Sequence, residues 1–208
     1  MKNVLCYGDS NTYGVNPFDG GRWPKEVRWP GVLQKGLGNE INIIEEGLGG
    51  RTTVWDDPLA EGRNGRKTLT MLLDSHKPLD LIIIMLGTND LKERFQALPE
   101  DIACGVGQLA SVIRSHFSID TCSEPEILLV SPIHLGKDVE HSVYSGFRNS
   151  AVKKSELLAP LIQKQAELYG CLFFDASLVA APNKADMLHM DEKNHAALAT
   201  AIQKLICL

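Results

Sequence analysis

The segment Asp80-Leu-Ile-Ile-Ile-Met-Leu-Gly-Thr-Asn-Asp90 decides the fold class of this chain. Its apolar run, Leu81 to Leu86, contains no polar residue and stops at a Gly-Thr-Asn-Asp turn. A short run that is apolar on both faces is typical of a strand inside a parallel sheet, covered by helices on both sides. The turn then offers polar side chains at the point where the strand ends.

Four more apolar runs of strand length end at polar or glycine-containing loops: Asn3 to Tyr7, Ile41 to Ile44, Ile127 to Val130 and Leu172 to Phe174. The segments between these runs have helical spacing, namely Trp29 to Leu37, Lys67 to Ser75, Ile102 to Phe117, Ser150 to Tyr169 and Glu192 to Ile206. Strands that alternate with helices form crossover units. This pattern predicts an α/β fold with a parallel sheet covered on both faces.

The polar loops all follow strands, and in parallel sheets ligands bind beyond the carboxyl ends of the strands. We therefore expect Ser10, the loop from Gly47 to Gly50 and Asn89 to meet at one edge of the sheet.

Composition limits the classes of protein that remain. The chain has 208 residues, of which 44% are hydrophobic, enough for one domain over residues 1–208. The net charge is −5 and the basic residues are scattered, so we expect no nucleic-acid partner. Met1 to Tyr7 is too short for a secretory signal, and no apolar run could span a bilayer. We expect a cytoplasmic protein with no membrane partner, and free thiols, because its five cysteines include no C-x-x-C pair.

Gly8-Asp9-Ser10-Asn11 follows the first strand directly, which places Ser10 at a strand-to-helix turn. There the hydroxyl can act as a nucleophile and the backbone N–H can face an anion. An Asp/Ser helix cap would give the same tripeptide. The elbow G-x-S-x-G of α/β-hydrolases does not fit, because Thr12 stands where the second glycine should be.

Asp186-Met187-Leu188-His189 stands just before the last helical segment. This spacing lets the carboxylate of Asp186 orient the imidazole of His189, which can then take the proton of Ser10. Taken alone, the same four residues would be read as a solvated polar loop.

Acyl transfer also needs fixed donors for the oxyanion of a tetrahedral intermediate. Ser10 can offer its own N–H, Gly50 can bring a backbone N–H close, and Asn89 can donate from its side-chain amide. In isolation, Asn89 could equally be the first residue of an Asx-turn.

Together these motifs make the chain similar to the SGNH (GDSL-like) hydrolases, a family named for Ser, Gly, Asn and His in four blocks. The matching blocks are G-D-S-N at 8–11, G-L-G-G-R-T-T at 47–53, G-T-N-D at 87–90 and D-M-L-H at 186–189. The chain most resembles the bacterial arylesterase and acyltransferase branch, through I-I-E-E-G-L-G-G-R-T-T, D-D-P at 56–58 and R-N-G at 63–65.

The resemblance implies a flavodoxin-like three-layer α/β/α sandwich with five parallel strands. It also implies that Ser10 is the nucleophile, His189 the general acid/base and Asp186 its orienting group. Ser10, Gly50 and Asn89 would form the oxyanion hole, without a metal or an organic cofactor. Gly49 adjoins Gly50, and we favour Gly50 because it immediately precedes Arg51-Thr52-Thr53.

Residues in or beside the predicted loops are candidates for the substrate pocket: Asn11, Trp55, Phe147, Met187 and Leu188. Asn11 departs from the Leu that the family often has, which bears on substrate preference. We expect Asp9 and Asp90 to hydrogen-bond within their own turns. A metal role for His189, Asp191 and His195 is disfavoured by their spacing, and we expect His195 to cap or pack the last helix.

These features predict a serine esterase that hydrolyses or transfers short acyl groups, such as acetyl, from aryl, alkyl or sugar esters. A thioesterase or lysophospholipase, or a carbohydrate deacetylase, would use the same triad. A binding module without catalysis is the alternative from another class. The resemblance also suggests that the chain forms a homo-oligomer. We expect its binding partner to be a small-molecule ester substrate.

Overall fold

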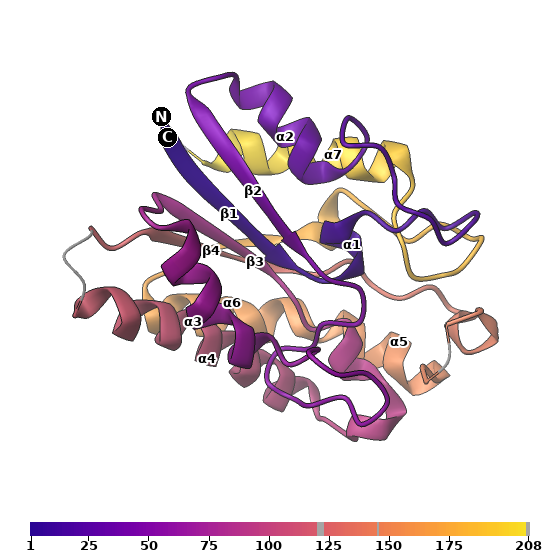
Figure 1. The fold of residues 1–208 in the computed structure, drawn as a ribbon. Helices are drawn as coiled ribbons and strands as arrows, with labels where there is room; N and C mark the ends of the chain where they lie inside the picture. The colour runs from indigo at the N-terminus through magenta and orange to yellow at the C-terminus, as the bar shows by residue number, and fades with distance from the viewer. Residues whose placement is uncertain (120–122, 145, 207–208) are drawn as a thin grey trace.

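A computed structural model describes residues 1–119, 123–144 and 146–206. Its five strands are all parallel: β1 (Lys2–Gly8), β2 (Ile41–Gly47), β3 (Leu81–Met85), β4 (Glu126–Ser131) and β5 (Leu172–Asp175). They lie in the order β2-β1-β3-β4-β5 (Figure 1). The predicted parallel sheet with five strands is confirmed, and this strand order is that of flavodoxin-like folds.

Helices cover both faces of the sheet (Figure 1). On one face lie α2 (Trp29–Leu37) and α7 (Glu192–Leu205), and on the other lie α3 (Gly65–His76), α4 (Pro99–Ser118) and α6 (Leu158–Tyr169). Shorter helices are α1 (Ser10–Tyr13), α5 (Asn149–Glu156) and the 3-10 turns η1 (Asn89–Leu91), η2 (Glu93–Phe95), η3 (Val139–His141) and η4 (Ala176–Leu178). The three layers agree with the prediction.

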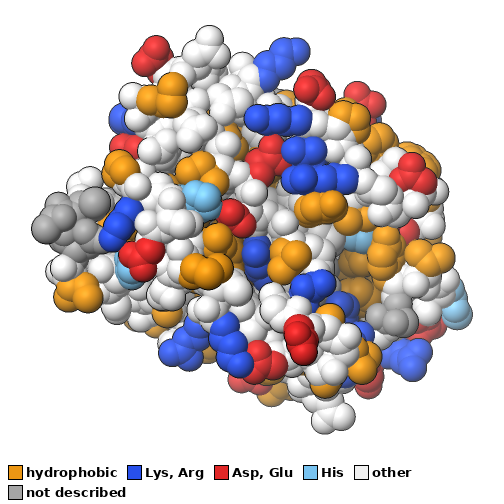
Figure 2. Space-filling model, viewed as in Figure 1, with side chains coloured by type: hydrophobic (Ala, Val, Ile, Leu, Met, Phe, Trp, Pro, Cys, Tyr) orange, Lys and Arg blue, Asp and Glu red, His pale blue; other side chains and the backbone are white. Residues whose placement is uncertain are grey.

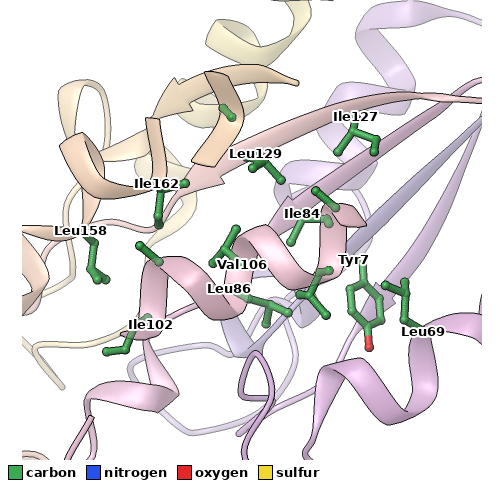
Figure 3. Packing of buried hydrophobic residues seen from close by; sticks show 14 of the residues in the cluster. Tyr7, Leu69, Ile84, Leu86, Ile102, Val106, Ile127, Leu129, Leu158 and Ile162 are labelled. Carbon is green, nitrogen blue, oxygen red and sulfur yellow. The ribbon is translucent and has the colours of Figure 1, made fainter. Parts of the chain in front are cut away.

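Side chains of each strand alternate between two hydrophobic cores. In β1, Leu5 and Tyr7 pack with α3, α4 and α6, while Val4 and Cys6 pack with α2 and α7. Figure 3 shows the larger core, where Ile84 of β3 lies near Val106 of α4. Because both faces are buried, β3 reads as a continuous apolar run in the sequence.

The last helix packs through its histidine. His195 is fully buried, and its Nδ1 accepts a hydrogen bond from the backbone N–H of Trp29 at 3.3 Å. This contact joins α7 to the start of α2, and the prediction that His195 packs the final helix is confirmed.

The prediction of one helix from Ser150 to Tyr169 is wrong, because the segment forms two helices that meet at Leu157. Pro160 is the reason. Its ring would clash with the carbonyl of Glu156, four residues earlier, so α5 ends there. In the first turn of α6 the missing N–H of Pro160 is tolerated, since that N–H needs no partner within the helix.

The order of the strands creates a crevice. From β1 the chain moves to β2 on one side and then to β3 on the other side, so the direction switches between β1 and β3. In open parallel sheets ligands bind at such a switch point. Ser10 follows β1 and Asn89 follows β3, so both residues lie at this crevice.

In the ranges that the structure describes, no helix has both the length and the apolar character needed to cross a membrane. Cys6, Cys104 and Cys171 are free thiols, while Cys122 and Cys207 lie outside the described residues.

Candidate active site

The turn that carries Ser10 is packed tightly over the ends of β1 and β2. A Cβ atom on Gly8 would lie 2.0 Å from Oγ1 of Thr12, and one on Gly47 would lie 2.1 Å from the backbone nitrogen of Tyr13. Both positions therefore require glycine. Asp9 caps the turn, since its carboxylate accepts the N–H of Asn11 at 2.9 Å, as predicted for a bond within the turn.

Three polar side chains form one continuous chain of hydrogen bonds. Oδ2 of Asp186 lies 2.6 Å from Nδ1 of His189, and Nε2 of His189 lies 2.8 Å from Oγ of Ser10. All three residues are buried, Ser10 being 7% exposed. A carboxylate accepts from Nδ1–H, which leaves Nε2 free to accept the proton of the serine hydroxyl.

The loop that carries Asp186 and His189 is held by its own carboxylate. The other oxygen of Asp186, Oδ1, accepts the backbone N–H groups of Leu188 at 3.0 Å and His189 at 2.9 Å. Met187 adopts a φ of +60°, which turns the chain so that these N–H groups point back at the carboxylate. The carboxylate therefore fixes both the imidazole and the loop beneath it.

Potential oxyanion donors lie beside Ser10. Gly49, Gly50 and Asn89 line the same cavity as Ser10 and His189. Nδ2 of Asn89 donates one hydrogen to the carbonyl of Arg51 at 3.1 Å, which fixes the amide and leaves its second N–H available. Gly50 has a φ of +81°, which only glycine adopts without strain.

The choice between Gly49 and Gly50 stays a prediction. Neither backbone N–H donates a hydrogen bond to another residue within the described ranges, so both are free to point at an anion.

Buried polar side chains hold the loop that carries Gly49 and Gly50. Oδ1 of Asp90 accepts both the backbone N–H of Thr53 at 2.8 Å and its hydroxyl at 2.6 Å. The expectation that Asp90 bonds within its own turn holds for a bond to its own backbone, but its stronger bonds go to Thr53, outside the turn. Its partner lies on the neighbouring loop, which the sheet topology brings alongside. Arg51 donates to the carbonyls of Gly8 and Glu46 and stacks on the ring of Tyr7.

Burial changes the acidity of the carboxyl groups around Ser10. It raises the pKa of Asp90 to about 6, although the hydrogen bonds from Thr53 oppose the change. Burial also raises the pKa of Asp9. The buried carboxyl groups of Asp9 and Asp90 therefore lie close to the turn that carries Ser10. Both favour the neutral form more than an exposed carboxyl group would.

Ser10 opens into a cavity of about 420 Å³, whose walls mix apolar and charged side chains. Tyr144, Phe147 and Leu188 supply apolar surface near His189, and the Tyr144 ring meets the imidazole edge to face at 4.7 Å. In the right half of Figure 2, where the carboxyl ends of the strands lie, Lys and Arg side chains stand beside hydrophobic ones. The cavity suits an organic substrate with both apolar and polar parts.

Of the five predicted pocket residues, two line the cavity and three do not. Phe147 and Leu188 line the cavity, whereas Asn11, Trp55 and Met187 are not part of its lining. Trp55 packs against Gly105 of α4, and Met187 packs against Gly136. Asn11 is 2% exposed, and its amide bonds to the backbone on both sides of His189.

Sequence reasoning missed several residues of the cavity wall: Asp57, Lys92, Arg94 and Tyr144. They come from three irregular segments with neither helical nor strand periodicity, so only the folded chain brings them together. The Asp56-Asp57-Pro58 motif carried the resemblance, but it gave no reason to place Asp57 in the cavity wall.

Comparison with known proteins agrees with this geometry. The chain is similar to a carbohydrate acetylesterase family member from Sinorhizobium meliloti, with 40% identity and a TM-score of 0.91 over 99% of this chain and 97% of that chain. It is also similar to the aryl esterase of M. smegmatis, with 36% identity and a TM-score of 0.91 over 99% of this chain and 98% of that chain. These likenesses support the prediction that this chain is a carboxylic ester hydrolase.

Among curated proteins, the uncharacterized lipoprotein YqeF of Bacillus subtilis (strain 168) is 36% identical over 89 residues. The match covers 43% of this chain and only 32% of the length of that lipoprotein. The model of the GDSL-like lipase/acylhydrolase family matches residues 6–198. The predicted family is confirmed, and the chain belongs to the GDSL-like lipase/acylhydrolase family.

Proposed function

We propose that this chain is a serine esterase that removes short acyl groups, such as acetyl, through an acyl-enzyme on Ser10. The observation that carries the proposal is the chain of hydrogen bonds Asp186–His189–Ser10, at 2.6 and 2.8 Å, which ends at the wall of the cavity. A serine hydroxyl bonded to an imidazole that a carboxylate orients is the arrangement that activates a serine for attack.

In the proposed reaction His189 takes the proton of Ser10 while Oγ attacks the ester carbonyl. The carbonyl oxygen becomes an oxyanion, which accepts hydrogen bonds from the N–H of Ser10, the amide of Asn89 and the N–H of Gly50 or Gly49. His189 then gives the proton to the leaving alcohol. Water, deprotonated by His189 in turn, releases the acid, and an alcohol in place of water would receive the acyl group.

The preference for short acyl groups rests on the cavity and on the relatives. The cavity of about 420 Å³ shares its space with charged side chains, which leaves little apolar length for a long acyl chain. The similar proteins of known structure are described as a carbohydrate acetylesterase and an aryl esterase. Activity on sugar acetates is the second candidate, because polar side chains in the wall can bind hydroxyl groups.

Steady-state hydrolysis of p-nitrophenyl acetate, butyrate, octanoate and palmitate tests the substrate class. We expect kcat/KM to be highest for acetate or butyrate. An optimum at octanoate or palmitate would instead support a thioesterase or lysophospholipase. Adding an alcohol acceptor and measuring the new ester by chromatography separates acyl transfer from hydrolysis. Comparing kcat/KM for acetylated xylose with kcat/KM for p-nitrophenyl acetate tests the preference for sugar esters.

A homo-oligomer is part of this proposal. Leu59 and Val143 stand at the cavity wall and are 77% and 88% exposed, so a second copy of the chain would remove apolar surface from water. Light scattering after size-exclusion chromatography measures the mass of the assembly.

The free thiols of Cys6, Cys104 and Cys171 support a cytoplasmic location, where thiols stay reduced.

A further inference from the structure

One cation in the wall of the active-site cavity forms no ion pair with any residue that the structure describes. Lys92 lines the cavity, yet its ammonium group makes no hydrogen bond or ion pair with any residue in the described ranges. Its Nζ lies over the ring of Phe147, 5.7 Å from the ring centre. A partly buried charge without a partner is unfavourable unless a ligand uses it.

Among the described residues, the carboxylate that shares the cavity wall with Lys92 forms its ion pair with Arg94 instead. Arg94 also lines the cavity, but it is committed to Asp57, since its Nη1 donates to both carboxylate oxygens at 3.1 and 3.4 Å. Asp57 is thus already paired with one cation. Burial, together with the like charge of Arg94, lowers the pKa of Lys92, although the carboxyl groups of Asp57, Asp9 and Asp90 act in the opposite direction.

The backbone of Lys92 is also held close to Asn89, a proposed oxyanion donor. It stands between η1 and η2, and its backbone N–H donates to the carbonyl of Asn89 at 3.3 Å. The next residue, Glu93, is fixed by its N–H to the carbonyl of Gly146 at 2.7 Å. One short hydrogen-bonded segment therefore carries both Asn89 and Lys92.

We propose that Lys92 selects substrates with an anionic group, so that the preferred substrate is a short-chain ester bearing a carboxylate at the end away from Ser10. The inference rests on the proposed esterase activity and adds the class of substrate to it. Lys92 and Arg94 line the wall together with Asp57. Two positive charges against one negative charge give the lining an excess of positive charge, which attracts an anion. The carboxylate would receive a charge-assisted hydrogen bond from Nζ.

The carboxylate could stand on the alcohol or on the acyl side of the ester, and two matched pairs of probes distinguish these. The alcohol-side pair is 4-acetoxybenzoate and its methyl ester. The acyl-side pair is the mono-4-nitrophenyl ester of adipic acid and 4-nitrophenyl hexanoate. For each pair the readout is the ratio of kcat/KM for the anionic ester to that for the neutral one.

We expect the ratio for one pair to fall at least about tenfold in Lys92→Gln and to stay within about threefold of wild type in Lys92→Arg. It should also fall as salt rises from 0.02 to 0.5 M, as expected for a charge interaction. The control is Lys164→Gln, which removes the same charge from an exposed position on α6. An unchanged ratio in Lys92→Gln for both pairs, or an equal fall in Lys164→Gln, would overturn the inference.

Equilibrium binding keeps this test separate from the test of esterase activity. Calorimetry measures the affinity of 4-hydroxybenzoate and of adipate for the wild type, Lys92→Gln and Lys164→Gln, and it needs no turnover. We expect the anion that matches the active pair to bind at least about tenfold more weakly to Lys92→Gln alone. Equal affinity in all three proteins would contradict the role of Lys92 even if every ester were hydrolysed. If no ester were hydrolysed, the proposed activity would fail while the binding result still decided the role of Lys92.

Discussion

Asn11 holds the backbone on both sides of His189. Its amide nitrogen donates to the carbonyl of Leu188 at 3.3 Å, and its amide oxygen accepts the N–H of Met190 at 3.0 Å. The residue after the proposed nucleophile therefore ties the turn of Ser10 to the loop of the imidazole. Asp9, which caps the turn of Ser10, accepts the backbone N–H of the same Asn11, so two residues outside the triad link the two segments that carry it.

Asn11→Ala is expected to lower both stability and turnover. The substitution leaves a buried carbonyl and a buried N–H without partners, at a cost of about 1–3 kcal/mol. It also frees the loop of His189, so kcat should fall more than KM rises. Urea unfolding and steady-state kinetics measure the two effects. Wild-type kcat in a folded Asn11→Ala protein would show that the loop holds its position without Asn11.

Asp186→Asn is expected to lower kcat/KM at least about a hundredfold, because the amide cannot stabilise the imidazolium that forms when His189 takes the proton. The loop should survive, since the amide oxygen can still accept the N–H groups of Leu188 and His189. Circular dichroism and the unfolding midpoint serve as controls. Activity within threefold of wild type would remove Asp186 from the proposed mechanism.

Asp90 gives stability a dependence on pH. Burial raises its pKa to about 6, so between about pH 4 and pH 6 the folded protein binds a proton that the unfolded chain has lost. This carboxyl group therefore favours folding below pH 4, and that advantage is lost as pH rises through 6. Asp90→Asn should gain on the order of 1–3 kcal/mol relative to wild type when pH rises from 4 to 7.5.

Chemical denaturation of both proteins at pH 4, 5, 6 and 7.5 measures the difference. Groups that do not interact with Asp90 titrate equally in the two proteins, so the difference between them reports Asp90 together with Asp9, whose charge acts on it. A constant difference over this range would mean that Asp90 stays ionised in the folded protein.

Gly47→Ala should destabilise the protein by more than about 2 kcal/mol and lower its activity, because the new Cβ would meet the backbone of Tyr13 at 2.1 Å and displace the turn of Ser10. Gly36→Ala on α2 is the matched control. The atoms nearest to its Cβ belong to the amide end of partly buried Gln203, a flexible side chain that can turn away, and alanine favours the helix by roughly 0.5–1 kcal/mol. Thermal melts and initial rates of both variants should separate them, and equal melting temperatures would argue against a backbone clash.

Much of the fold could be predicted because each strand is short, contains an apolar run and is followed by a polar or glycine-containing turn. The buried run of β3 and the blocks at Ser10, Asn89 and His189 stand out for this reason. The break between α5 and α6 was also visible in principle, since Pro160 forbids a continuous helix through Glu156.

The rest of the site could not be predicted because its contacts cross the chain. The bond from Thr53 to Asp90 and the ion pair from Arg94 to Asp57 each span 37 residues. Periodicity describes neighbours along one element, and these residues lie in loops that become neighbours only when the sheet forms. Asn11 shows the same limit, because its adjacency to Ser10 suggested a pocket residue and gave no sign of a partner near His189.

The identity of the nucleophile is the central claim, and the mass of the intact protein after brief mixing with p-nitrophenyl acetate, quenched in acid, tests it most directly. We predict one added acetyl group in the wild type, located on the peptide that contains Ser10, and no added mass in Ser10→Ala, together with a loss of about 10³-fold or more in kcat/KM. Burst kinetics in Ser10→Ala equal to wild type, or an acetyl group on another residue that turns over at the wild-type rate, would contradict the account.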